Sequence, residues 1–79
     1  MIELKKTLSD IVKTIVDYPD EITILETESG NEIILELHIA PSDMGKVIGR
    51  HGKIAKAIRS VMKAAANSIG KKVSVEIKD

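Results

Sequence analysis

The sequence predicts an α+β domain in which three helices pack on one face of a three-stranded mixed sheet, in the order α-β-β-α-α-β. Two observations carry this prediction. Apolar residues repeat with helical spacing near both ends of the chain and alternate with strand spacing elsewhere. The connection between the second and third strands, roughly residues 40 to 71, is long enough for a right-handed crossover to a parallel strand.

The length and composition predict a single domain over residues 1–79. A chain of 79 residues cannot divide its core further and remain stable. Apolar residues make up 43% of the chain, and Tyr18 is the only aromatic, so aliphatic side chains must build the core. The absence of cysteine suits a reducing compartment, and no segment resembles a signal peptide or a membrane span. These features predict a cytoplasmic protein without a membrane partner.

The first helix is predicted from one apolar stripe and ends at the run D-Y-P-D, residues 17 to 20, because Pro19 biases Tyr18 away from helical geometry. The stripe consists of Leu4, Leu8, Ile11, Val12 and Ile15.

A hairpin follows, with its turn at Ser29, Gly30 and Asn31. In its second strand, four buried positions alternate with wetter ones, and the buried set is Ile33, Leu35, Leu37 and Ile39. The sequence offers His38 no partner at metal-ligand spacing, so this histidine is interpreted as a solvated strand residue.

A short helix is predicted after Pro41, with Asp43 in its first turn and Gly49 at its end. The last helix begins near Gly52 and is capped by Gly70. We expect its buried stripe to be Ile54, Ala57, Ile58, Val61, Ala65 and Ile69, with Lys53, Lys56, Arg59 and Lys63 on the opposite side. Val73, Val75 and Ile77 alternate in the final strand.

The charge is neutral in total but strongly uneven. Between Met44 and Lys72 lie eight lysines and arginines and no acid, whereas residues 1 to 43 hold three basic and ten acidic residues. Such asymmetry steers a polyanion to one side of a protein.

The run G-K-V-I-G-R-H-G-K-I, residues 45 to 54, allows three interpretations. A dinucleotide loop needs G-x-G-x-x-G after a strand. Here Val47 occupies the first glycine position of that pattern, and the preceding segment is predicted to be helical. A triphosphate loop fails because Val47 replaces its first glycine and Ile54 its hydroxyl residue. A single-strand clamp fits, because Gly49 and Gly52 let a phosphodiester backbone approach main-chain N–H groups at the start of a helix.

In this context the run V-I-G-R-H-G-K-I resembles the KH (K-homology) family of type II. Over nearly its whole length the chain resembles the short bacterial single-KH RNA-binding proteins of the KhpA type. The resemblance implies a type II KH fold and binding of about four nucleotides of single-stranded RNA. It also implies pairing with a second copy or with a larger Jag-type KH protein, an RNA chaperone activity and a role in cell shape and cell wall growth.

Gly49 and Gly52 correspond to the two loop glycines of that family, Arg50 and His51 to the variable pair between them, and Lys53 to the first basic residue of the next helix. The predicted RNA-binding residues are Lys46, Val47, Ile48, Gly49, Arg50, His51, Gly52, Lys53, Ile54 and Lys56. Because the groove has no aromatic residue for stacking bases, we expect low sequence selectivity.

No catalytic set can be assembled from the sequence, so we expect no enzyme, cofactor, bound metal or small-molecule substrate. One alternative stays open from the residues alone. The basic face could instead belong to a protein-interaction module that docks an acidic protein partner.

Overall fold

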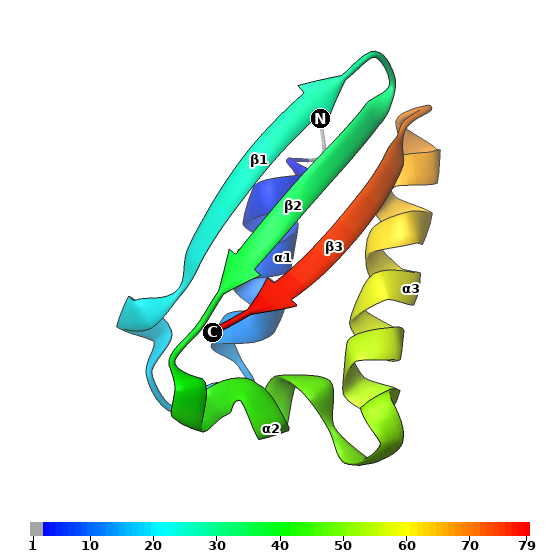
Figure 1. Cartoon of the computed structure of the whole chain (residues 1–79). Coiled ribbons are helices and arrows are strands. Elements are labelled where there is room, and N and C mark those ends of the chain that lie inside the picture. The colour runs from blue at the N-terminus through cyan, green and yellow to red at the C-terminus, as the bar shows by residue number, and fades with distance from the viewer. Residues whose placement is uncertain (1–2) are drawn as a thin grey trace.

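The predicted order of elements is confirmed in the computed structural model, which describes residues 3–79 (Figure 1). The helices are α1 Leu4–Lys13, α2 Met44–Ile48 and α3 Lys53–Ser68, and the strands are β1 Thr23–Ser29, β2 Glu32–His38 and β3 Lys72–Lys78. Single 3₁₀ turns, Pro19–Glu21, Pro41–Asp43 and Arg50–Gly52, precede β1, α2 and α3.

The sheet is mixed, with β2 in the centre. β1 pairs antiparallel with β2, so that Ile24 lies opposite Leu37. β3 pairs parallel with β2, so that Val75 lies opposite Leu35. Gly30 takes a φ of 61° in the tight turn between the first two strands, a conformation that glycine adopts without strain. The parallel crossover and the hairpin predicted from the sequence are both confirmed.

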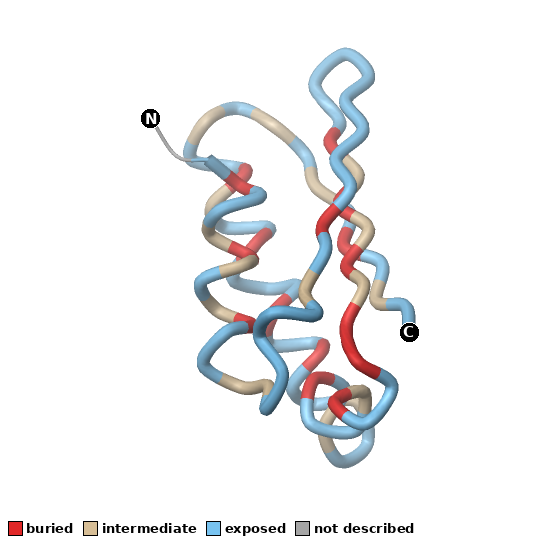
Figure 2. The backbone as a smooth tube through the Cα atoms, turned by 90° about the vertical axis from the view of Figure 1, so that its left-hand side faces the viewer, coloured by how far each residue is buried: buried red, intermediate tan, exposed pale blue. Residues whose placement is uncertain are grey.

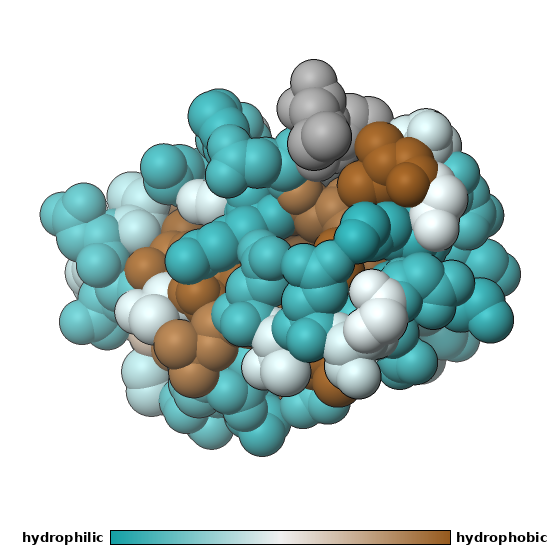
Figure 3. Space-filling view, turned by 90° about the horizontal axis from the view of Figure 1, so that it is seen from above, coloured by the Kyte–Doolittle hydropathy of each residue, from teal (hydrophilic) through white to brown (hydrophobic). Residues whose placement is uncertain are grey.

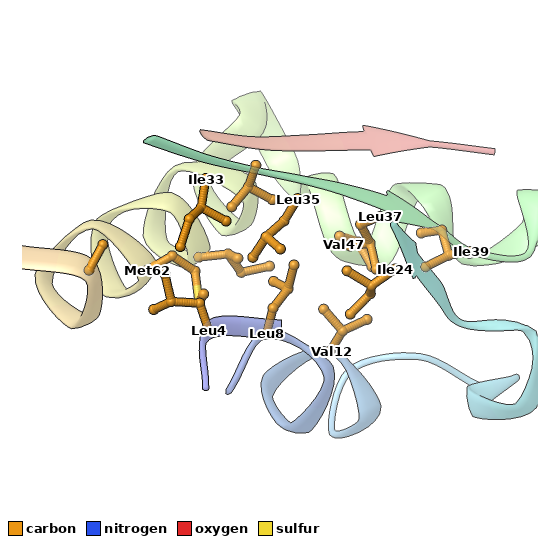
Figure 4. Close-up of a cluster of buried hydrophobic side chains, with 13 residues drawn as sticks. Leu4, Leu8, Val12, Ile24, Ile33, Leu35, Leu37, Ile39, Val47 and Met62 are labelled. Carbon is orange, nitrogen blue, oxygen red and sulfur yellow. The ribbon is translucent and has the colours of Figure 1, made fainter. Parts of the chain in front are cut away.

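The core lies between this sheet and the helices α1 and α3, which therefore cover the same face (Figure 4). The buried residues of β2 point into it, as the alternating pattern predicts, and the opposite face carries Glu36 and His38. Figure 2 marks the buried residues in red, and they occur on both the helices and the strands that enclose this core. Fully buried leucine side chains come from both layers, Leu8 from α1 and Leu35 and Leu37 from β2.

The first helix ends earlier than predicted. α1 stops at Lys13, four residues before the run that contains Pro19. The N–H groups of Thr14 and Ile15 donate to Ile11 and Val12 in tight turns of i to i−3 type. Three successive β-branched residues, at positions 14 to 16, lower the helix propensity here before proline can act.

The buried face of α3 also differs from the prediction. The buried residues are Ala55, Ile58, Met62 and Ala66. Ile54 and Val61, which were expected in the core, are 38% and 52% exposed, and Ala57 is exposed as well. α3 carries two apolar stripes with helical spacing, and the stripe with alanine at both ends is the one that packs against the core. The second stripe is left on the surface.

The end of the molecule opposite α2 is mostly hydrophilic, with separate apolar areas (Figure 3).

His38 lies on the open sheet face, where its Nε2 is 3.3 Å from a carboxylate oxygen of Glu36. Lys78 donates to the other oxygen at 2.6 Å and holds the pKa of Glu36 below its ordinary value.

Within residues 3–79, no helix has the length and apolar character needed to cross a membrane.

Candidate nucleic-acid interface

The corner between α2 and α3 has an unusual backbone. Gly49 has φ 75° and ψ 172°, His51 has φ 57° and ψ 25°, and Gly52 has φ 73° and ψ 14°. Three of four consecutive residues therefore have positive φ values. His51 is the one residue with a side chain that adopts such a value in the described part of the chain, and histidine tolerates this region better than most residues.

The two glycines are needed for different reasons. A Cβ on Gly49 would lie 2.3 Å from Cγ1 of Ile54, so the turn has no room for a side chain there. A Cβ on Gly52 would meet no heavy atom within 4 Å. Gly49 therefore allows α3 to fold back against the end of α2, while Gly52 leaves the outer surface of the loop bare.

The backbone amides at the tip of the loop face no partner. The N–H of Gly49 donates to Gly45, and that of Gly52 donates to Gly49. For the N–H groups of Arg50 and His51, residues 3–79 offer no backbone acceptor. Two consecutive unpaired amides beside the positive end of the α3 dipole form a surface suited to an anionic oxygen.

The basic residues predicted for the site do gather at this corner. Arg50, His51, Lys53 and Lys56 are all exposed, on the loop and the first turn of α3. No acidic residue lies in that first turn, so the local field stays positive. Lys46 is also exposed, on α2, but it forms an ion pair with Asp17. Hydrogen bonding to this carboxylate raises the pKa of Lys46.

The three apolar residues of the predicted site fall into two groups. Ile48 and Ile54 are each 38% exposed and flank the loop, as predicted. Val47 is fully buried in the core, so the expectation that it supplies surface to RNA was wrong. On a helix as short as α2, adjacent residues point in different directions, and the side that faces the core carries Val47.

Asp43 was predicted only as a favourable charge in a first helical turn, and it has a larger structural role. Its carboxylate is fully buried and accepts hydrogen bonds from the N–H groups of Asp17, at 3.0 Å, and Tyr18, at 3.1 Å. These bonds tie the segment before β1 to the start of α2. Together with the ion pair of Lys46, they anchor the helix that carries the glycine loop.

A groove lies between α3 and the edge strand β3, and α3 runs upward from the loop in the orientation of Figure 1. The groove has a volume of about 310 Å³ and is lined by Arg59, Lys63, Val73, Ser74 and Val75. The Nε of Arg59 donates to the carbonyl oxygen of Val75 at 3.2 Å. None of these five residues was among the predicted site residues. The charge run on α3 indicated Arg59 and Lys63, but only the topology shows that β3 lies beside them.

The described residues contain no group of three histidine, cysteine or carboxylate residues that could hold a metal ion. A larger cleft, of about 480 Å³, lies between α1 and the edge of β1 and is lined by charged residues of both signs, with Ile22 and Ile24. It is formed by other elements than the glycine corner and the groove beside β3, which share helix α3.

Comparison with known proteins agrees with this geometry. The family model described as KhpA/KhpB, KH domain, matches residues 5–77. The protein named RNA-binding protein KhpA from Clostridium acetobutylicum is 55% identical over 74 residues, which cover 94% of this chain and 99% of that protein. Its namesake from Clostridium perfringens is 51% identical with the same coverage. The one from Aquifex aeolicus is 38% identical over 98% of both chains.

No solved structure matches the chain. The match of the family model over residues 5–77, the high identity over almost complete chains and the α-β-β-α-α-β topology with its glycine corner all agree. The chain belongs to the KhpA/KhpB family of KH domains.

Proposed function

We propose that this chain is a non-catalytic protein that binds single-stranded RNA, and that the loop from Gly49 to Gly52 grips about four nucleotides. The observation that carries the proposal is the pair of unpaired N–H groups at Arg50 and His51, held at the start of α3 among exposed basic side chains. Phosphate oxygens accept hydrogen bonds from such amides. The names of the related proteins, which state RNA binding, support the same conclusion.

The strand leaves the loop along the groove between α3 and β3. Ile48 and Ile54 give apolar contacts beside the loop, and Arg59 and Lys63 place positive charge along the path. The one aromatic residue, Tyr18, lies on the segment before β1, outside this groove. Stacking on aromatic rings therefore contributes nothing here, and we propose low sequence selectivity over most of the four positions.

A titration at several salt concentrations tests phosphate recognition. A four-nucleotide footprint engages about two to four phosphates, so log affinity against log salt should have a slope of about −1.4 to −2.8 for a single strand. Fluorescence anisotropy with a labelled uridine-rich octamer gives this slope. A slope near zero, or no binding at low salt, would oppose the proposal and favour the basic face as a dock for an acidic protein.

We also propose that two exposed apolar residues of α3, Ala57 and Val61, pair two copies of the chain. They lie on the flank of α3 that faces away from β3, whereas Arg59 and Lys63 lie on the flank beside it. A dimer through the first flank leaves both grooves open, and two linked grooves bind one RNA with greater avidity. A larger Jag-type KH protein, the partner that the resemblance implies, would use the same flank.

Replacing Val61 with aspartate should convert such a dimer to a monomer, because the change buries a charge in an apolar contact. The side chain is 52% exposed, so the fold should lose less than about 0.5 kcal/mol. Sedimentation velocity at micromolar concentrations measures the change, with Asn67→Asp on the opposite flank as the matched control. A monomeric parent protein, or a V61D variant that stays dimeric, would contradict pairing through this flank.

A further inference from the structure

The side chain of Arg59 crosses the groove from α3 to β3. Its Nε donates to the carbonyl oxygen of Val75, and within residues 3–79 no other hydrogen bond engages its guanidinium group. Because the guanidinium is rigid and planar, a bond from Nε–H leaves free the end-on pair of N–H donors, one on each terminal nitrogen, and directs this pair away from that carbonyl. The contact with β3 therefore positions a pair of parallel N–H donors at the groove.

The edge of β3 explains why this contact is available. Alternate residues of a strand direct their N–H and C=O groups to opposite sides. The N–H of Lys72 and the carbonyl of Lys78 bond on the side of β2, so the even-numbered residues of β3 face that strand. The odd-numbered residues, Val73, Val75 and Ile77, direct their backbone groups away from β2, and the Nε–H of Arg59 donates to the carbonyl oxygen of Val75.

A parallel pair of donors selects among nucleobases by simple chemistry. It matches two adjacent acceptor atoms, such as O6 and N7 of guanine. Cytosine also has two adjacent acceptors, O2 and N3. Adenine and uracil offer no such adjacent pair, because an N–H or NH₂ donor stands beside their acceptors or, between N1 and N3 of adenine, a C–H group separates them.

We propose that Arg59 reads one base of the bound strand and selects guanine or cytosine over adenine or uracil at that position. This inference rests on the proposed RNA binding and adds one selective position to a groove that is otherwise unselective. Arg59 recognises the base, and the carbonyl of Val75 positions Arg59. Lysine cannot perform this role, because its ammonium group is a point charge without the planar pair of donors.

The experiment compares four RNA pentamers, U-U-N-U-U with each base at the centre, bound to the parent protein and to Arg59→Lys. We expect the parent to bind the guanine and cytosine oligomers about tenfold more tightly than the other two. In R59K, which keeps the charge, the four affinities should become equal and close to that of the parent for the all-uridine oligomer. Circular dichroism verifies that the variant is folded.

Lys63→Ala provides the matched control in the same groove. It removes a charge without removing the planar donors, so all four affinities should fall together while the preference stays. Equal binding of the four oligomers by the parent, or a preference that survives in R59K, would overturn the assignment of Arg59. Failure of every oligomer to bind would instead reject the RNA-binding function itself, and the base selection with it.

Discussion

Replacing Arg50 and His51 together with aspartate is expected to abolish RNA binding while the domain stays folded. The double change places two negative charges beside the N–H groups at the tip of the loop, where the phosphates make their closest approach. It also removes the positive charge of Arg50 from the same position. Because affinity in such complexes comes chiefly from phosphate contacts, repulsion at this point should reduce it below detection.

The structure explains why the fold should survive this change. Both side chains are exposed. His51 has a φ of 57°, and aspartate is among the residues that tolerate this left-handed region. Acidic residues close to the start of a helix also interact favourably with its dipole. The first turn of α3 contains no acid in the parent protein, so the two aspartates add this interaction. We therefore expect a change of less than about 0.5 kcal/mol in the free energy of unfolding.

Thermal unfolding by circular dichroism and an RNA titration measure the two effects separately. A matched control lowers the net charge by the same amount on α1, with Lys5→Asp and Lys13→Gln, both exposed. This control should keep most of the affinity. If the loop variant folds and binds RNA as well as the control does, the loop is not the clamp. The basic side of α3, with Lys56, Arg59 and Lys63, would then be the site.

The sequence predicted the topology well because the decisive signals are local. The alternation from Ile33 to Ile39 gave β2 its buried face, Gly30 marked the hairpin, and Gly49 and Gly52 marked the corner between helices. Each signal depends on a few neighbouring residues and on backbone geometry that glycine permits. Local rules of this kind hold irrespective of how the elements pack.

The errors concern choices that only packing makes. α3 has two apolar stripes, and the sequence alone did not show that Met62 is buried and Val61 exposed. Asp43 was predicted only as a favourable charge in a first helical turn, because the sequence does not show that the segment at Asp17 lies against it. Likewise, Arg59 became part of a groove because the parallel crossover brings Val75 beside it. The contacts of Asp43 and Arg59 join residues far apart in the chain. On α3, the two apolar stripes are equal as local patterns, so only packing decides which one is buried.

Replacing Gly49 with alanine should destabilise the domain far more than the same change at Gly52. With φ 75° and ψ 172°, Gly49 adopts a conformation that is essentially restricted to glycine, and a side chain there costs about 1–3 kcal/mol. The new Cβ would also lie 2.3 Å from Cγ1 of Ile54 and 2.9 Å from its backbone nitrogen. Relieving that overlap costs about 1–3 kcal/mol more.

Gly52 provides the matched comparison. Its φ of 73° and ψ of 14° are left-handed, which costs alanine about 1–2 kcal/mol, and a Cβ there meets no heavy atom within 4 Å. From the midpoints of these ranges, the free energies of unfolding of the two variants in urea should differ by about 2.5 kcal/mol, in favour of G52A. In a domain of this size, each 1 kcal/mol corresponds to about 4–8 °C in Tm.

The two variants also separate the structural role of the loop from its binding role. A methyl group on Gly52 projects into the open space over the loop, where the proposed phosphate lies, so G52A should bind RNA more weakly although it is largely folded. Gly49→Ala should lose affinity only in proportion to its unfolded fraction or to the distortion of the turn. If G52A keeps the affinity of the parent, the RNA backbone does not approach the outer surface of Gly52. If the two variants are equally stable, Ile54 moves aside at little cost, and close packing of this residue against Gly49 is not what closes the corner between α2 and α3.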